Sequence, residues 1–266
     1  MTRHLGLQSP LDTGYTAVVE RASAAARIAE LTEEQWGLVT RRELGRAGIP
    51  PTTVDRLTAP GSSLERVAHG VYRLAGTPEP DHRDLRAAWL QLAPQTPAWE
   101  RTPADGVISH RSAAALYGIG HLPADRHEFT VQSRKQTRRP DVRLHRRSLT
   151  DSEWIHLRGL PVTRPSRIAS DLLYDHEDPD AVAQVVADAI RPGYDYPGTF
   201  ADSLAAHAAR FGLRRGDGTA LLRWLLDLAG DPGTSQWLEQ ARAHTGRRSA
   251  ELAPAVSLPR PGAPAP

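Results

Sequence analysis

Three polar side chains share one face of a helix expected over residues 51–59: Thr52, Thr53 and Arg56. The helix is expected because a proline pair at its start has the backbone angle of a first helical turn. Val54 and Leu57 would lie on the opposite, buried face. Arginine can hydrogen-bond O6 and N7 of guanine together, and threonine can bond a base edge or pack its methyl group on thymine. The spacing therefore predicts a helix that reads bases in the major groove of DNA.

A second helix is expected just before this one. Thr40-Arg41-Arg42-Glu43 has the pattern of a capping box, in which the threonine hydroxyl and the glutamate carboxylate each accept a backbone N–H. The helix would end at Gly48, since glycine readily adopts the backbone conformation that terminates a helix. It carries three arginines placed for phosphates: Arg41, Arg42 and Arg46. Phosphate contacts of this kind orient a protein on the duplex without reading its sequence.

Two short strands are expected over residues 64–67 and 71–74, with a tight turn at His69-Gly70 between them. This hairpin offers three further DNA-contacting side chains: Arg66, His69 and Arg73. Helix, turn, helix and hairpin, in this order, are typical of a winged helix-turn-helix. Residues 36–76 contain six arginines and three acidic residues, which favours DNA as the partner. The alternative is a small α+β domain whose winged shape serves protein contacts.

A second basic segment lies further along the chain. Residues 111–147 contain nine basic and three acidic residues, concentrated in the loop sequence RKQTRRPD. This loop would join two paired strands, over residues 127–133 and 142–149, as a hairpin. The second basic patch predicted here comprises Arg134, Lys135, Arg138, Arg139 and Arg143. It could extend a nucleic-acid footprint or bind an acidic partner; the alternative is a solvated loop kept charged for solubility.

No catalytic site is predicted. The chain has no HExxH, Walker, GxSxG or GxGxxG motif, and its histidines show no metal-ligand spacing. His110 begins a predicted helix, where an exposed or capping role is expected. The acidic stretch from Asp171 to Asp180 could bind a hard metal ion, but a structural partner and a solvated helix end explain it better. We therefore expect no enzyme, no metal and no cofactor; an unrecognised enzyme using this acidic stretch is the competing hypothesis.

Composition restricts the class of protein further. The 266 residues include no cysteine, which excludes disulfides and thiolate metal sites. The N-terminus has no apolar signal segment, and no apolar run approaches the roughly 20 residues that span a bilayer. We therefore expect a cytoplasmic protein. Residues 1–150 contain 21 basic and 16 acidic side chains, a charge of +5, whereas residues 151–266 contain 12 and 15, a charge of −3. This asymmetry favours a polyanionic partner for the first part.

The chain is expected to be α+β, with five segments. They are a disordered N-terminus (1–16), a winged helix-turn-helix DNA-binding domain (17–78), a mixed α/β domain (79–195), a helical C-terminal region (196–250) and a disordered, proline-rich tail (251–266). Beyond the winged domain, the pattern predicts helices over residues 84–92, 110–118 (with Ser109 as the cap), 163–173, 180–190 and 200–229. A third strand is expected over residues 154–157.

Three stretches carry a resemblance to a known family. They are LERVAHGVYRLAG in the hairpin, VISHRSAAALYGIGHLP at residues 107–123 and GLPVTRPSRIASDLL at residues 159–173. In order and spacing they resemble the AbiEi family, the antitoxins of type IV (abortive-infection) toxin–antitoxin systems, which serve in phage defence. The resemblance covers about residues 25–190.

The resemblance implies a winged helix-turn-helix that binds double-stranded operator DNA and represses the toxin–antitoxin operon. It implies an antitoxin domain that counteracts a cognate nucleotidyltransferase-like toxin, and leaves open direct contact with the toxin and the oligomeric state on DNA. DNA binding would carry over to Arg41, Arg42, Arg46, Thr52, Thr53, Arg56 and the hairpin. Some relatives append a nuclease-like domain, but the last third of this chain lacks the lysine that such a domain needs. The alternative function is a stand-alone winged-helix transcriptional regulator without a toxin partner.

Overall fold

The computed structural model describes the backbone of residues 24–252 and the side chains of residues 24–244. The predicted disordered segment 1–16 and the tail from residue 253 onward lie outside the described residues. The chain forms two compact units. The first runs to Ser112 and resumes over Ala124–Val162; the second comprises Ala113–Pro123 and the chain from Thr163 onward. Domain boundaries were expected near residues 78 and 195. These boundaries concern which segments fold independently, a different property from membership of the two compact units, so they remain predictions.

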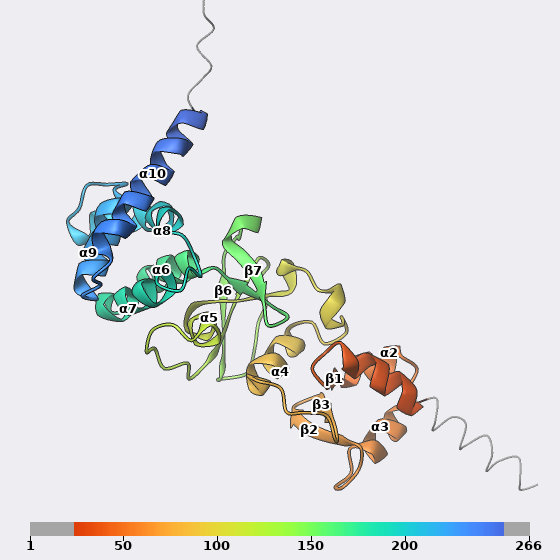
Figure 1. Cartoon of the computed structure of the whole chain (residues 1–266). Coiled ribbons are helices and arrows are strands. Elements are labelled where there is room, and N and C mark those ends of the chain that lie inside the picture. Colours follow the sequence, from red (N-terminus) through yellow and green to blue (C-terminus); the bar gives the residue numbers. More distant parts are fainter. Residues whose placement is uncertain (1–23, 253–266) are drawn as a thin grey trace, which may run out of the picture. The chain divides into compact units, whose positions relative to one another are not determined.

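The first unit begins with a small three-stranded antiparallel sheet and three helices (Figure 1). The strand order is β1-β3-β2. After a helix over residues 24–33, the elements are β1 (Leu38–Thr40), α2 (Arg41–Arg46), α3 (Pro51–Leu57), β2 (Leu64–Ala68) and β3 (Val71–Leu74). The two short helices and the hairpin occur where the sequence predicts them. Strand β1 was not predicted; it pairs with β3 through the register Val39↔Tyr72.

The core of this part follows the apolar spacing of the sequence. Residues from every one of its elements form a single buried cluster: Ile28, Val39, Leu44, Ile49, Val54, Leu64 and Tyr72. The predicted capping box is present, since Glu43 N–H donates to Thr40 Oγ1 and Thr40 N–H donates to the Glu43 carboxylate. Helix α3 ends at Leu57 instead of Ala59, because Thr58 already leaves the helical conformation as the C-cap.

The first unit also contains a five-stranded mixed sheet of order β6-β5-β4-β8-β7. Its strands are β4 (Val107–Ile108), β5 (His127–Val131), β6 (Val142–Arg146), β7 (Trp154–Leu157) and β8 (Leu160–Thr163). Strands β5 and β6 pair in parallel, with His127 opposite Val142. The predicted hairpin is therefore wrong. Because the two strands run in the same direction, residues 132–141 must return as a crossover from the end of β5 to the level at which β5 begins.

The helix expected after Ser109 is present as α5 (His110–Tyr117), but the apolar residues before it, Val107–Ile108, form strand β4, which was not predicted. One predicted helix start needs correction. Thr163 was expected as a helix cap, but it is the last residue of β8. The next helix, α6, begins at Pro165 with Arg164 as its N-cap residue. There a buried apolar run followed directly by a helix was attributed to the helix, because periodicity alone does not separate the two.

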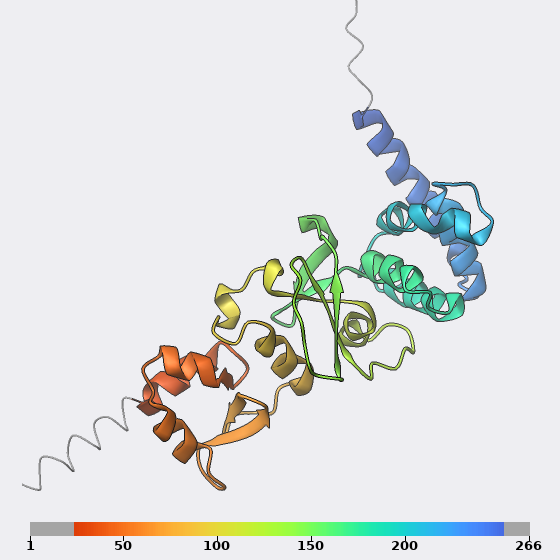
Figure 2. The ribbon, with the colours of Figure 1, turned by 180° about the vertical axis from the view of Figure 1, so that it is seen from behind.

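Helix α4 (Arg83–Leu92) packs against the small sheet and follows it along the chain (Figure 2). Its C-terminal carbonyls are bound by one partly buried side chain, Arg101, which donates to the carbonyls of Trp89, Leu90 and Ala93 at 2.5–2.8 Å. The Arg101 guanidinium also lies over the Trp89 ring, 4.4 Å from its centroid. Arg101 thereby fixes the loop that follows α4.

The second unit is helical over its described residues after Thr163 (Figure 1). Its helices are α6 (Pro165–Tyr174), α7 (Pro179–Ile190), α8 (Pro197–Leu204), α9 (Gly218–Leu228) and α10 (Thr234–Leu252), with a 3-10 segment at Ala205–Phe211. Helix α8 packs against α6, α9 and α10. Gly218 permits the approach of α8 and α9, because a Cβ atom there would lie 1.8 Å from the Ala201 carbonyl oxygen. None of the helices described has the length and apolarity to span a membrane.

Candidate nucleic-acid interface

Helix α3 presents the polar face that its spacing predicts. Val54 is buried, with 1% of its surface exposed, whereas Thr52 and Arg56 are exposed and Thr53 is partly exposed. Within the described part of the chain, the side chains of Thr52, Thr53 and Arg56 have no hydrogen-bond or ion-pair partner. These donors are therefore available to an external ligand.

The arginines of α2 differ in how they are held. Arg41 forms an ion pair with Asp55 of α3 at 2.8 Å, and this hydrogen bond raises the pKa of the Arg41 guanidinium. Arg46 donates to the carbonyl of Gln95 and lies 3.9 Å from the Glu100 carboxylate. Arg42 is exposed. A shallow pocket of about 460 Å³ lies between α2 and the loop after α4, lined by Arg42, Arg46, Gln95 and Thr96.

The hairpin places its three predicted side chains in different environments. Arg66 and His69 are exposed, and an Arg66 nitrogen lies 3.3 Å from His69 Nδ1. Arg73 lies opposite Glu65 in the β2–β3 register and forms an ion pair with it at 2.5 Å. Arg73 also donates to the Thr77 carbonyl at 2.8 Å, and only 19% of its side chain is exposed. Of the three, Arg73 has the strongest competing partners within the protein.

The crossover between β5 and β6 carries the second basic patch. Lys135 donates to the Asp105 carbonyl at 2.8 Å, and burial lowers the pKa of its ammonium group. Arg139 pairs with Asp141. Arg143, on β6, lies 3.7 Å from the Glu128 carboxylate. Arg134 and Arg138 are exposed and, among the described residues, have no side-chain partner.

One residue outside every predicted set joins the hairpin to this crossover. Gln91, near the end of α4, donates from its side-chain amide to the His69 carbonyl at 2.7 Å. Its amide oxygen accepts a hydrogen bond from the Arg139 guanidinium. The sequence shows Gln91 only as a polar position in an amphipathic helix, so this link could not be predicted from it.

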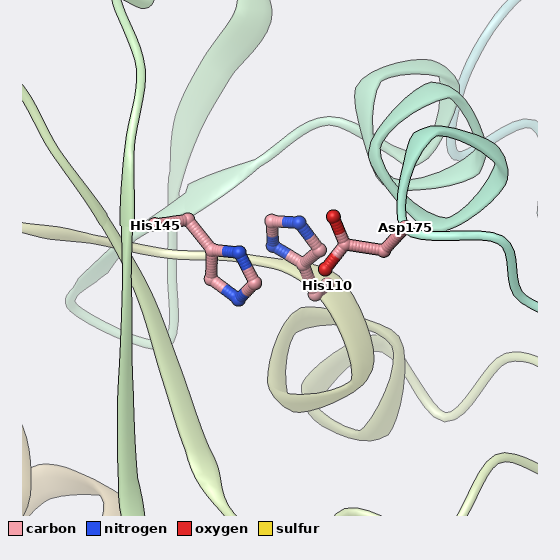
Figure 3. A group of neighbouring side chains, drawn as sticks. All are labelled: His110, His145 and Asp175. Atoms are coloured by element: carbon pink, nitrogen blue, oxygen red, sulfur yellow. The ribbon is translucent and has the colours of Figure 1, made fainter.

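A buried polar network joins strands β5 and β6 of the larger sheet to the start of α5, and no sequence pattern indicates it (Figure 3). The rings of His110 and His145 stack with centroids 3.5 Å apart and planes 13° apart. The prediction of an exposed or capping His110 is wrong, since only 1% of it is exposed. His110 Nδ1 lies 2.9 Å from Ser109 Oγ. Asp175, the third side chain that Figure 3 labels, follows α6 in the second unit.

Glu128 carries the negative charge of this network. Its carboxylate accepts the backbone N–H of Arg111 at 2.9 Å and lies 3.3 Å from His145 Nε2. Burial alone would raise the pKa of Glu128, but the hydrogen bonds with His145 and Arg111 and the nearby positive charges lower it overall. Glu128 is therefore ionised and tied to β6 and to the start of α5.

The acidic stretch at residues 171–180 has structural partners. Asp171 forms an ion pair with Arg167 at 3.0 Å within α6, and Asp178 caps the N-terminus of α7 by accepting the Asp180 N–H. These contacts account for two of its carboxylates. The prediction that the chain binds no metal and no cofactor remains a prediction.

Comparison with known proteins bears on the small sheet and its helices. Residues 26–75 match the sequence model of a family described as "Transcriptional regulator, AbiEi antitoxin". The matched segment extends from the helix at residues 24–33 through the end of β3. No curated protein matches the chain at a significant level. The predicted resemblance to the AbiEi antitoxins is therefore confirmed over residues 26–75, and it remains a prediction for the stretches at residues 107–123 and 159–173.

Proposed function

We propose that this protein is a DNA-binding antitoxin that represses its own toxin–antitoxin operon and counteracts a cognate nucleotidyltransferase-like toxin. One observation supports DNA binding most directly. Within the segment that matches the AbiEi regulators, helix α3 exposes Thr52 and Arg56 with no partner inside the described chain, while Val54 anchors the opposite face. Donors that the protein leaves unsatisfied on a rigid helix suit recognition of base edges.

In this proposal residues 24–76 act as a winged helix-turn-helix, with α3 as the recognition helix and the β2–β3 hairpin as the wing. Thr52, Thr53 and Arg56 would contact bases. Arg41, Arg42 and Arg46 of α2 would bind phosphates on one side of the groove, and Arg66 and His69 of the wing would bind them on the other. Arg73 would support the wing through Glu65 more than it contacts DNA, since its guanidinium is already paired.

The antitoxin part of the proposal rests on the family description alone. A protein with this proposed function would act in the cytoplasm, where operator DNA and toxin are both accessible. The remaining alternative, a stand-alone regulator without a toxin, makes the same DNA contacts. Co-expression with the product of the neighbouring gene separates the two: an antitoxin restores the growth that the toxin arrests, and a stand-alone regulator has no such partner.

Binding titration tests the DNA-binding part. The probe is a duplex from the region directly upstream of the protein's own coding sequence, compared with a shuffled duplex of equal length and composition. We expect preference for the upstream duplex, reduced in Arg56→Ala and kept in Arg223→Ala, which removes an exposed arginine from α9 in the second unit. Equal affinity of the wild-type protein for the two duplexes would overturn sequence-specific repression.

A further inference from the structure

We infer that the wing and the β5–β6 crossover form one DNA-contacting surface, joined by Gln91, and that this surface holds the phosphate backbone beside the site read by α3. The inference rests on the proposed function and extends it, because the crossover lies outside the segment that matches the AbiEi regulators. The partner is the duplex flanking the operator, recognised by its charge and not by its bases.

The position of the crossover follows from the sheet topology. Because β5 and β6 are parallel, residues 132–141 run the length of both strands instead of turning at one end. Lys135 donates to the Asp105 carbonyl near the beginning of this path, and Arg139, near its end, donates to the side-chain amide oxygen of Gln91 on α4. The segment is thus attached to the unit at two points and is not a free loop.

The unpaired charges of the crossover are adjacent to these attachments. Arg134 precedes Lys135, and Arg138 precedes Arg139. Both are exposed, and within the part of the chain that the structure describes neither has a side-chain partner. The one acidic side chain of residues 132–141, Asp141, pairs with Arg139 and not with Arg134 or Arg138.

Gln91 brings this segment to the wing. One end of its amide group donates to the His69 carbonyl at the wing tip, and the other end accepts from Arg139. The wing tip and the crossover are therefore separated by a single side-chain amide. Arg66 and His69 are exposed on the wing, and Arg134 and Arg138 are exposed on the crossover, so the two segments together carry more exposed basic side chains than either provides alone. Gln91 is a positioning residue here, since its role is to hold the two segments together.

The chemistry of this surface fits a DNA backbone. Exposed guanidinium groups on two attached segments match a row of phosphates, and their contribution is electrostatic and independent of base sequence. An acidic protein would use the same charges. The length of the duplex separates the two partners, because only DNA binding depends on how far the duplex extends past the operator.

The experiment uses the full-length protein and two duplexes: the operator alone and the operator extended by about one helical turn on each side. We expect Arg134→Ala/Arg138→Ala to weaken binding to the extended duplex by roughly 10- to 30-fold at about 0.15 M salt, and to reduce the slope of log K against log salt by about 1.8. Binding to the short duplex should not change. The control, Arg214→Ala/Arg215→Ala, removes an exposed arginine pair of the second unit and should behave as wild type on both.

A second variant tests the link. Gln91→Glu keeps an acceptor for Arg139 but loses the donor to the His69 carbonyl. We expect reduced affinity for the extended duplex alone, and a smaller further loss when Arg134 and Arg138 are then removed. Circular dichroism melting of each variant establishes that the fold is retained.

The outcomes separate this inference from the proposed function. Equal losses on both duplexes, or no loss on either, would overturn the joint surface. So would normal DNA binding with lost toxin counteraction, since the patch would then serve an acidic protein. If the wild-type protein binds no operator, the proposed function itself fails. If Arg56→Ala abolishes binding while Arg134→Ala/Arg138→Ala binds as wild type, only the present inference fails.

Discussion

At the scale of single residues, Arg56 and Val54 separate DNA recognition from folding. They are two positions apart on α3, and one is exposed while the other is buried. We expect Arg56→Ala to leave the melting temperature unchanged and to cost about 1–3 kcal/mol of binding to the operator, with a smaller loss on shuffled DNA. Titration and thermal melting measure the two effects separately. A lower melting temperature with unchanged binding would mean that α3 is not the recognition helix.

Val54→Ala should have the opposite effect. It removes two methyl groups from the buried cluster around Leu44 and Leu64, so the free energy of unfolding should fall by about 1–2.5 kcal/mol. Binding per folded molecule should be preserved. Loss of specific binding at temperatures where the variant is fully folded would contradict this assignment.

Glu128 makes a residue-scale prediction about pH. Because its pKa is lowered in the folded protein, the unfolded chain binds the proton more readily. The stability contributed by Glu128 is therefore present above the ordinary carboxyl pKa of about 4.3 and is lost as pH falls through the lower folded value. Glu128→Gln should lower the melting temperature near neutral pH and make it less dependent on pH in the acid range.

Thermal melting at a series of pH values measures this effect. The matched control is Glu239→Gln, the same substitution at an exposed position of α10. It should follow the wild-type pH dependence throughout. If Glu128→Gln also follows the wild-type pH dependence of the melting temperature, the lowered pKa of Glu128 contributes nothing measurable to stability.

At the scale of secondary-structure elements, Arg101 determines how α4 ends. Burial lowers its pKa to about 10, and its guanidinium donates to four backbone carbonyls, those of Trp89, Leu90, Ala93 and Thr96. Lysine cannot reproduce this planar set of donors. We expect Arg101→Lys to destabilise the first unit by about 2–4 kcal/mol, since buried carbonyls lose their partners.

Chemical denaturation followed by tryptophan fluorescence measures this loss. Arg83→Lys is the control, because Arg83 lies at the exposed start of the same helix and pairs with Glu79 and Asp84. It should change stability by less than about 0.5 kcal/mol. Similar values for the two variants would show that the α4 carbonyls do not depend on Arg101.

The elements also show what the sequence could and could not predict. Local signals were sufficient for the capping box at Thr40, the helix at Pro51 and the turn at Gly70, because each depends on residues a few positions apart. The parallel pairing of β5 and β6 depends on contacts between distant segments, and alternation of apolar residues does not distinguish parallel from antiparallel strands. The partners of Arg73, Arg101 and Gln91 are likewise set by tertiary packing.

At the scale of the whole molecule, the uneven charge predicts a strong salt dependence. If the four arginines that we assign to phosphates, Arg41, Arg42, Arg46 and Arg66, all meet them, log K should fall with log salt with a slope of roughly −3.6. Arg42→Ala should flatten the slope by about one unit and weaken all duplexes alike. Titrations at several salt concentrations provide the slope. An affinity that does not change with salt concentration would exclude the proposed contacts between these arginines and the DNA phosphates.

The strand order of the larger sheet has a consequence for synthesis on the ribosome. Strand β4 pairs with both β5 and β8, so its sheet cannot close until residue 163 has emerged, whereas the small sheet is complete at residue 74. The difference is 89 residues, which take roughly 5–20 s at about 5–20 residues per second. The recognition helix can therefore fold on the nascent chain well before the crossover that we place beside the wing. A nascent chain arrested between these points should already bind the operator, but without the contribution of the flanking duplex.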